Sequence, residues 1–216
     1  MARFELFRQH STADIRRMER EGDAAGLIEV LKAPRVSRSD HLRTAVVIAL
    51  RRAQLSEAVP EVNSLLLSDP AVSVRRSAAI ALGEFGDPAA LPALRQALDD
   101  DSEIVQLWAI KSIGRLGDRD SVIRLIDLLD SPDSGFRSYA AQALGQIGDQ
   151  RATEPLISHL DDSSGTVQIA ICLALGQLGD SRAIPALREA QGQAGWWGRR
   201  RFAAALADLE GRFGAA

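Results

Sequence analysis

Apolar residues recur along this chain at intervals of three and four positions. Between residues 69 and 100, Val74, Ala78 and Leu82 form one such set, and Leu91 and Leu94 belong to a second. This spacing places each set on one face of an α-helix. No stretch alternates β-branched and polar residues, so strands are not expected. The pattern predicts two consecutive helices, called helix A and helix B below.

The two-helix pattern returns with a fixed period of 31 residues. Three sets of apolar positions superimpose at this shift: Val74, Val105, Phe136 and Val167; Leu82, Ile113, Leu144 and Leu175; Leu94, Leu125, Leu156 and Leu187. A fixed period indicates stacked structural repeats, each of which buries its apolar faces against its neighbours. The chain is therefore predicted to be all-α, an α-solenoid of about five to six two-helix repeats.

The period also predicts how the chain is divided. One repeat domain is expected over residues 1–216, with a degenerate N-terminal cap unit at 1–36 and a C-terminal capping helix within 193–216. The repeats between them are 37–68, 69–100, 101–131, 132–162 and 163–192. The last helix, expected near 199–212, has no helix B after it. It is predicted to leave apolar surface for a partner or a second copy of the chain.

A glycine-rich stretch follows helix A in four repeats. It reads LGEFGD at 82–87, IGRLGD at 113–118, LGQIGD at 144–149 and LGQLGD at 175–180. Glycines followed by helix amides can hold phosphate, but an aspartate at the helix start repels phosphate and occupies those amides. The stretch is therefore interpreted as architectural. Gly83 and Gly86 are predicted to let the backbone turn, and four aspartates are predicted to cap helix B: Asp87, Asp118, Asp149 and Asp180.

The repeat resembles a known family. The pattern D-x-x-V-R…A-A-x-A-L-G-x-I-G-D is similar to the short HEAT-like repeat named after phycobilisome lyases, closely over residues 70–190. The resemblance implies an α-solenoid with helix A on the convex side and helix B on the concave side. Proteins with this repeat include bilin lyases, phycobilisome-degradation factors, adaptors and assembly factors. It therefore predicts the fold much better than the function.

One family position varies within the chain. The arginine that follows the valine is present at Arg75 and Arg137, and Arg199 aligns with it in the last helix. Gln106 and Gln168 replace it in the alternate repeats. The interpretation is structural: a ladder of arginine–aspartate pairs between neighbouring repeats.

Three groups of residues are candidates for partner binding. On helix B, the predicted concave face has both signs of charge, which fits either a solvated surface or a polar docking face: Arg124, Asp127, Arg151, Glu154, Arg182 and Arg188. On helix A, an apolar stripe fits either an interface or stacking between neighbouring helices: Leu107, Trp108, Tyr139, Ile169 and Leu173.

The third group lies in the stretch GWWGRRRF at 195–202. It consists of Trp196, Trp197, Arg199, Arg200 and Arg201. Aromatic and arginine side chains together can stack on bases, bind anions or form an interface hot spot. The alternative is a final loop whose tryptophans cover the end of the core.

Composition and charge restrict the function further. Charged residues make up 25% of the chain and the formal net charge is −3, so no overall basic field attracts nucleic acid. The single cysteine, Cys172, and the absence of a secretory signal or an apolar run of membrane-spanning length favour a cytoplasmic protein.

The usual signatures of enzymes are missing from the sequence. His10, His41 and His159 are dispersed, and no His-Glu dipeptide of the HEAT-repeat deoxyhypusine hydroxylases is present. His159 is expected to be partly buried and structural, and Cys172 to be a small residue on the inner side of helix A. No phosphate-binding or dinucleotide fingerprint occurs. No catalytic, cofactor-binding or metal-binding residue is therefore predicted.

The sequence favours a non-catalytic scaffold, adaptor or assembly factor that binds another protein, with a homodimer through the terminal unit or the helix A stripe as an alternative. A second hypothesis is a bilin-lyase-like or phycobilisome-processing factor, which only the resemblance supports. A third is nucleic-acid binding through the C-terminal tryptophan–arginine cluster, which the mixed charge of the chain opposes.

Overall fold

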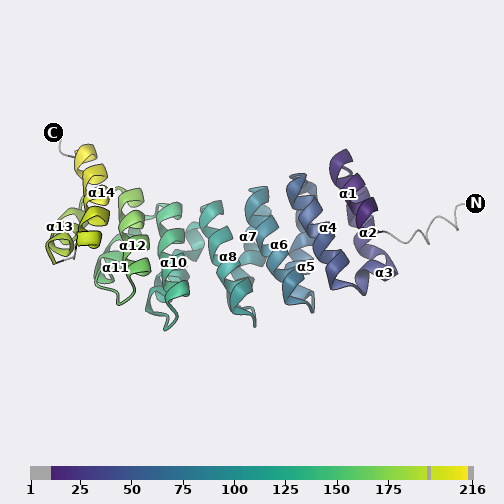
Figure 1. Cartoon of the computed structure of the whole chain (residues 1–216), viewed down its shortest axis with the longest axis horizontal. Helices are drawn as coiled ribbons and strands as arrows, with labels where there is room; N and C mark the ends of the chain where they lie inside the picture. Colours follow the sequence, from purple (N-terminus) through teal and green to yellow (C-terminus); the bar gives the residue numbers. More distant parts are fainter. Residues whose placement is uncertain (1–10, 194–195, 214–216) are drawn as a thin grey trace, which may run out of the picture. The chain divides into compact units, whose positions relative to one another are not determined.

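The structure is a computed structural model that describes residues 11–193 and 196–213. Every regular element in these two ranges is helical, which confirms the all-α prediction (Figure 1). None of the helices in the described ranges combines the length and the apolar character needed to cross a membrane. The chain divides into two compact units, residues 1–112 and 113–216, and the boundary falls within helix α8 (Glu103–Leu116).

Unit 1 begins with three helices that precede the regular repeats. In the regular part, the A helices α4 and α6 pack side by side, and α5 packs against both α6 and α7 (Figure 1). Helices α1 and α2 pack on α4. The helices are α1 (Thr12–Glu21), α2 (Ala24–Lys32), α3 (Pro34–Ser37), α4 (Asp40–Arg52), α5 (Val59–Ser68), α6 (Val72–Phe85) and α7 (Leu91–Gln96).

Unit 2 continues the same order. The A helices α10, α12 and α14 form one layer, and α11 packs against α12 and α13 (Figure 1). The helices are α9 (Val122–Asp127), α10 (Ser134–Ile147), α11 (Thr153–Ser158), α12 (Gly165–Leu178), α13 (Ala183–Gln193) and α14 (Trp196–Phe213). In both units, most B helices are short and begin with a 3₁₀ turn, such as Pro88–Ala90 and Gln150–Ala152. The division into one domain with the repeat boundaries given above stays a prediction.

The core is built from the positions that superimpose at the 31-residue shift. Leu82 of α6 is completely buried, as are Leu144 and Leu175 at the same position in α10 and α12. The aligned leucines of the B helices are also inaccessible to solvent: Leu94, Leu125, Leu156 and Leu187. The period therefore identified the side chains that hold neighbouring helices together, and burial of each contributes about 2 kcal/mol.

The two glycines of each loop have different roles. The second one ends helix A in the left-handed conformation, as predicted: φ is 72° at Gly86, 70° at Gly117, 71° at Gly148 and 66° at Gly179. The prediction for the first glycine was wrong, because Gly83 lies inside α6 and is buried. A methyl group there would lie 2.9 Å from the Cα atom of Ser112. Gly83 therefore allows two helices to approach closely and makes no turn.

Three of the four predicted aspartate caps are present. Asp87, Asp149 and Asp180 each accept a hydrogen bond from the backbone amide two residues later, at 2.8 Å, 3.0 Å and 3.0 Å. The prediction was wrong for Asp118, which caps no amide with its side chain and instead accepts a hydrogen bond from the Ser121 hydroxyl at 2.5 Å. The other three repeats have alanine at the position of Ser121, so this hydrogen bond cannot form in their loops.

Candidate functional site

Two arginines predicted to bind a partner through helix B tie neighbouring loops of unit 2 together. Arg151 donates to the carboxylate of its own loop, Asp149, at 2.9 Å and to the backbone carbonyl of Arg119 in the preceding loop at 2.9 Å. Arg182 repeats this arrangement with Asp180 at 2.5 Å and the carbonyl of Gln150 at 3.5 Å. Both guanidinium groups are half-exposed. Their contacts explain them as links between repeats.

The hydrogen bonds from these arginines to their own loops lower the pKa of two carboxyl groups. The side-chain hydrogen bond from Arg151 lowers the pKa of Asp149 to about 2, and the one from Arg182 does the same for the pKa of Asp180. A carboxyl group whose pKa is lower in the folded than in the unfolded state stabilises the fold above the unfolded value, and this contribution disappears as the pH falls through the folded value. These loops therefore stabilise unit 2 above about pH 4 and stop doing so near pH 2.

We expect the Asp149→Asn, Asp180→Asn double variant to unfold at a lower urea concentration than the wild type at neutral pH. The difference in unfolding free energy between the two proteins should shrink between about pH 4 and about pH 2, because the wild-type carboxylates become protonated there. Urea unfolding followed by circular dichroism at several pH values measures this difference. If the difference in unfolding free energy stayed constant down to pH 2, the stabilising role of the Asp149 and Asp180 carboxylates would be contradicted.

The remaining candidates of the B layer are exposed. Arg124, Asp127 and Glu154 lie at the surface, and Arg188 pairs with Glu210 of α14 at 2.7 Å. Ala93 of α7 belongs to the core, because it is only 4% exposed. Helix α7 has only six residues and is flanked by 3₁₀ turns, which have three residues per turn and change which side faces the core.

The predicted arginine–aspartate pairs are present, but they lie within one repeat, so the prediction that they link neighbouring repeats was wrong. Arg75 donates to both carboxylate oxygens of Asp100, at 2.8 Å and 2.9 Å, and Arg137 makes the same pair with Asp162 at 2.7 Å and 2.9 Å. A third pair, Arg43 with Asp69, was missed because its repeat lacks the glycines; its two hydrogen bonds measure 2.6 Å and 2.8 Å. The arginine of each pair lies in helix A and the aspartate follows helix B of the same repeat.

The glutamines that replace arginine keep half of this arrangement. Arg43, Arg75 and Arg137 each also donate to the backbone carbonyl six residues earlier. Gln106 and Gln168 make this bond as well, to the carbonyls of Asp100 and Asp162. In these two repeats, the positions that correspond to the paired aspartates are occupied by Ser131 and Gln193, neither of which is charged. Arginine is thus present in the repeats that have the aspartate, and glutamine is present in the repeats that lack it.

The apolar stripe of the A helices is mostly half-buried. Leu107 and Trp108 in unit 1, and Tyr139 and Ile169 in unit 2, are partly covered by neighbouring side chains. Leu173 of α12 is different, because it is 57% exposed. It lies one turn after Ile169 on the outward side of the helix.

A small cleft on the outward side of the A helices in unit 1 includes one of these residues. It has a volume of about 220 Å³ and is lined by Ile48 and Arg51 of α4, Arg76, Ser77 and Ile80 of α6, and Trp108 of α8. The ammonium group of Lys111 lies 4.0 Å from the centre of the Trp108 ring. Trp108 belongs to the apolar stripe predicted from the sequence. The signal that sequence reasoning missed is Arg76, which stands where the other repeats have Leu107, Ser138 and Ile169.

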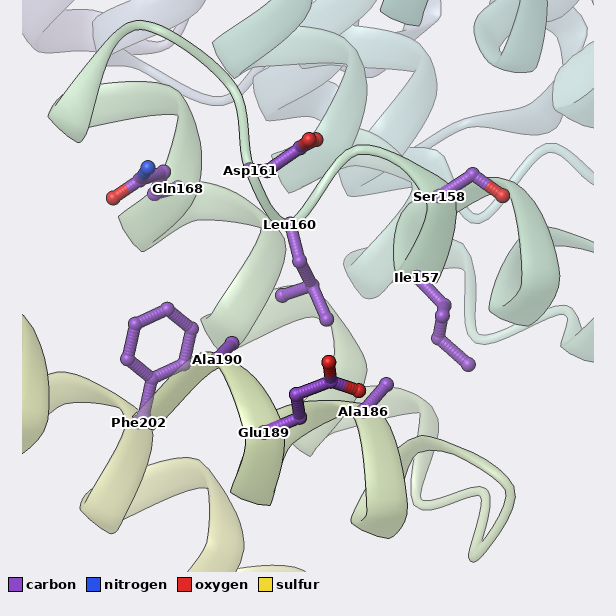
Figure 2. A pocket seen from close by; sticks show the side chains of 9 residues that line it. All are labelled: Ile157, Ser158, Leu160, Asp161, Gln168, Ala186, Glu189, Ala190 and Phe202. Carbon is purple, nitrogen blue, oxygen red and sulfur yellow. The ribbon is translucent and has the colours of Figure 1, made fainter. Parts of the chain in front are cut away.

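The largest of the cavities described, about 450 Å³, lies in unit 2 beside the Gln168 position of the ladder (Figure 2). Leu160, Phe202 and Glu189 surround the opening. The carboxylates of Asp161 and Glu189 stand on opposite sides of Leu160, so they do not converge on one point (Figure 2). Within the described ranges no group of three or more histidine, cysteine, aspartate or glutamate residues is arranged to hold a metal ion.

The two single residues singled out by the sequence have structural contacts. Cys172 is buried, as predicted. His159 is half-buried, and its ring nitrogens contact the carbonyl oxygen of Pro155 at 2.8 Å and a carboxylate oxygen of Asp130 at 3.1 Å. Burial opposes the charged imidazole, but these two hydrogen bonds outweigh burial and raise the pKa of His159.

The C-terminal cluster is helical where a loop was the alternative. Helix α14 begins at Trp196, three residues before the predicted start, and contains the arginines. Arg199 is exposed, and its carbonyl accepts a hydrogen bond from Gln191 at 3.3 Å. The side chains of Trp196, Trp197, Arg200 and Arg201 lie outside the described residues, as does His10.

Comparison with known proteins identifies the repeat. The family model described as HEAT repeats matches four overlapping segments, residues 24–114, 61–143, 92–167 and 124–207. The chain belongs to the HEAT repeat family. A search of curated proteins found no match.

Two solved structures illustrate the likeness. The first is the complex of CpcE and CpcF of phycocyanin lyase from Nostoc sp. PCC7120, with 28% identity and a TM-score of 0.61 over 70% of this chain and 64% of that chain. This HEAT repeat chain therefore spans less than two thirds of that lyase chain. The second is a designed armadillo repeat protein in complex with the peptide (KR)4, with 23% identity and a TM-score of 0.61 over 85% of this chain and 98% of that one. Both confirm an α-solenoid, and the first confirms the resemblance to the lyase repeats.

Proposed function

We propose that this protein is a non-catalytic scaffold that binds another protein through the outward side of its A helices. The observation that carries the proposal is Leu173, which is 57% exposed on a helix whose opposite side is already buried in the core. Ile169 extends the apolar surface by one turn. Both sides of α12 are therefore apolar.

The physical argument rests on the contrast with the B layer. Arg151 and Arg182, the most prominent charges there, are engaged in links between loops. Leu173 and Ile169 lie one turn apart, so a partner that covers both would remove continuous apolar surface of the A side from water. HEAT and armadillo repeats form a general protein-interaction fold, which supports the same conclusion.

The test compares two substitutions of equal chemistry. Leu173→Lys places a charge on the A layer, and Ile123→Lys places one on the B layer at an almost identical starting exposure of 55%. Tagged full-length variants are captured from the native host and the bound proteins are quantified by mass spectrometry. We expect a stoichiometric partner to fall at least tenfold with Leu173→Lys and to be retained with Ile123→Lys.

Other outcomes of this experiment are decisive in different ways. Loss of the partner with Ile123→Lys alone would move the interface to the B layer. Unchanged capture and unchanged oligomeric state in both variants would contradict the scaffold proposal. If the protein captured is a second copy of this chain, size-exclusion chromatography with light scattering should show a dimer that Leu173→Lys dissociates.

A second candidate is a bilin-lyase-like activity on a phycobiliprotein, which the 28% identity to the phycocyanin lyase chain favours. It predicts that protein purified from a bilin-containing host carries bilin absorbance or transfers bilin to an acceptor. A colourless preparation that transfers no bilin would remove this candidate and leave the scaffold proposal unaffected.

A further inference from the structure

The cleft on the A layer of unit 1 combines an apolar floor with cationic side chains. Ile48, Ile80 and Trp108 line it from three consecutive A helices, and each is partly exposed. Arg51 and Arg76 line the same cleft, and Lys111 covers the Trp108 ring from one side. Cations therefore stand beside an apolar surface in a chain whose formal net charge is −3.

The cations differ in how far the protein neutralises them. Arg51 lies 3.2 Å from the carboxylate of Glu84, and both side chains are about one-third exposed. Arg76 is exposed and has no ion pair or side-chain hydrogen bond with any residue of the described ranges. Its guanidinium, with five donors in a planar fork, is suited to binding a carboxylate with two hydrogen bonds.

The size of the cleft indicates the kind of ligand. Its volume of about 220 Å³ is below the roughly 300 Å³ at which pockets for small molecules begin. It has room for a single large side chain. A protein segment that inserts one apolar residue and carries acids beside it fits this cleft, because two arginines line it together with the apolar side chains.

The residues that α6 contributes to the cleft are not repeated in α10 or α12. The positions of Arg76 and Ile80 in α6 correspond to Ser138 and Gln142 in α10, and to Ile169 and Leu173 in α12. These positions are therefore polar in α10, where Ser138 is buried, and apolar in α12. The combination of arginine and isoleucine occurs in α6 and in neither of these two helices.

We propose that this cleft binds an acidic segment of a partner protein, with an apolar residue of the segment against Ile80 and Trp108 and its carboxylates paired with Arg76. This inference rests on the proposed scaffold function and adds the chemical class of the partner. Paired charges of opposite sign should speed association and make affinity depend on salt.

The test uses purified full-length protein and a short fluorescein-labelled peptide that alternates glutamate with leucine. Fluorescence anisotropy should show saturable binding that weakens as salt is raised. Arg76→Glu should reduce the affinity at least tenfold. The matched control is Arg38→Glu, which makes the same change of net charge at another exposed arginine of unit 1, and it should stay within about twofold of the wild type.

Two further probes separate the cleft from general charge attraction. A peptide with serine in place of leucine should bind at least tenfold more weakly, and Leu173→Lys should leave peptide binding unchanged, which distinguishes this inference from the interface in unit 2. The inference is overturned if no saturable binding occurs, if Arg38→Glu and Arg76→Glu weaken binding equally, or if a single-stranded oligonucleotide binds more tightly than the peptide through Arg76.

Discussion

Gly145→Ala is expected to destabilise the protein by about 2 kcal/mol, although alanine is the better helix former. Gly145 lies inside α10, where a methyl group would stand 2.6 Å from the Cα atom and 2.9 Å from the Cβ atom of Ala174 in α12. The first of these neighbours is backbone, so relief requires the two helices to move apart. That movement would loosen the buried layer around Leu144 and Leu175.

The chain contains a matched control for this substitution. Gly176 occupies the same position in the next repeat, but a methyl group there would meet Ala205 at 3.8 Å, an ordinary contact. Gly176→Ala should therefore be neutral or stabilise by up to about 1 kcal/mol through helix propensity. Urea unfolding of the two variants measures both effects. Equal stability changes would show that Gly145 is not required for the close approach of α10 and α12.

Arg43→Gln is expected to destabilise the protein by about 3 kcal/mol, because it leaves Asp69 charged, buried and without its arginine. The side chains of Arg43 and Asp69 are only 9% and 3% exposed, and the hydrogen bond from Arg43 to Asp69 raises the pKa of the guanidinium. Asp69 also accepts a hydrogen bond from the amide of Ala71 at 2.9 Å. A shift of the Asp69 side chain after the loss of Arg43 would therefore disturb the start of α6 as well.

The double variant Arg43→Gln, Asp69→Ser should recover most of the stability. It recreates the combination of glutamine and serine that the chain already has at Gln106 and Ser131. A double-mutant cycle by urea unfolding isolates the interaction between the two side chains, and we expect the double variant to lie within about 1 kcal/mol of the wild type. Additive losses in the two single variants would show that the pair is not coupled and that the ladder does not act as described.

Sequence reasoning identified the ladder only in part. It found Arg75 and Arg137 because they follow the family pattern, and it missed Arg43 because that repeat lacks the glycines and is offset by 32 residues. It also treated Arg151 and Arg182 as partner-binding candidates, since a one-dimensional pattern shows that they face outward on helix B. The carbonyl groups of the preceding loops that they bind come from residues about one repeat earlier, which a position on a single helix does not reveal.

For the candidate surfaces too, the sequence did not show what neighbouring helices contribute. The members of the stripe from Leu107 to Leu173 differ in exposure, because neighbouring helices cover some of them. The unit 1 cleft involves residues of α4, α6 and α8, and its volume depends on how closely those helices pack.

Periodicity in the sequence was sufficient to establish the all-α solenoid, the buried positions of each repeat and the left-handed glycines that end helix A. These features follow from local helix geometry and from the need of every repeat to bury the same two faces. Tertiary packing was needed to show that Gly83 and Gly145 serve helix contact, that Asp118 binds a serine hydroxyl, and that Arg76 lines an apolar cleft without an ion-pair partner among the described residues. Each of these depends on atoms brought together from different helices or loops, and distances between them are not encoded in the spacing of residues along one helix.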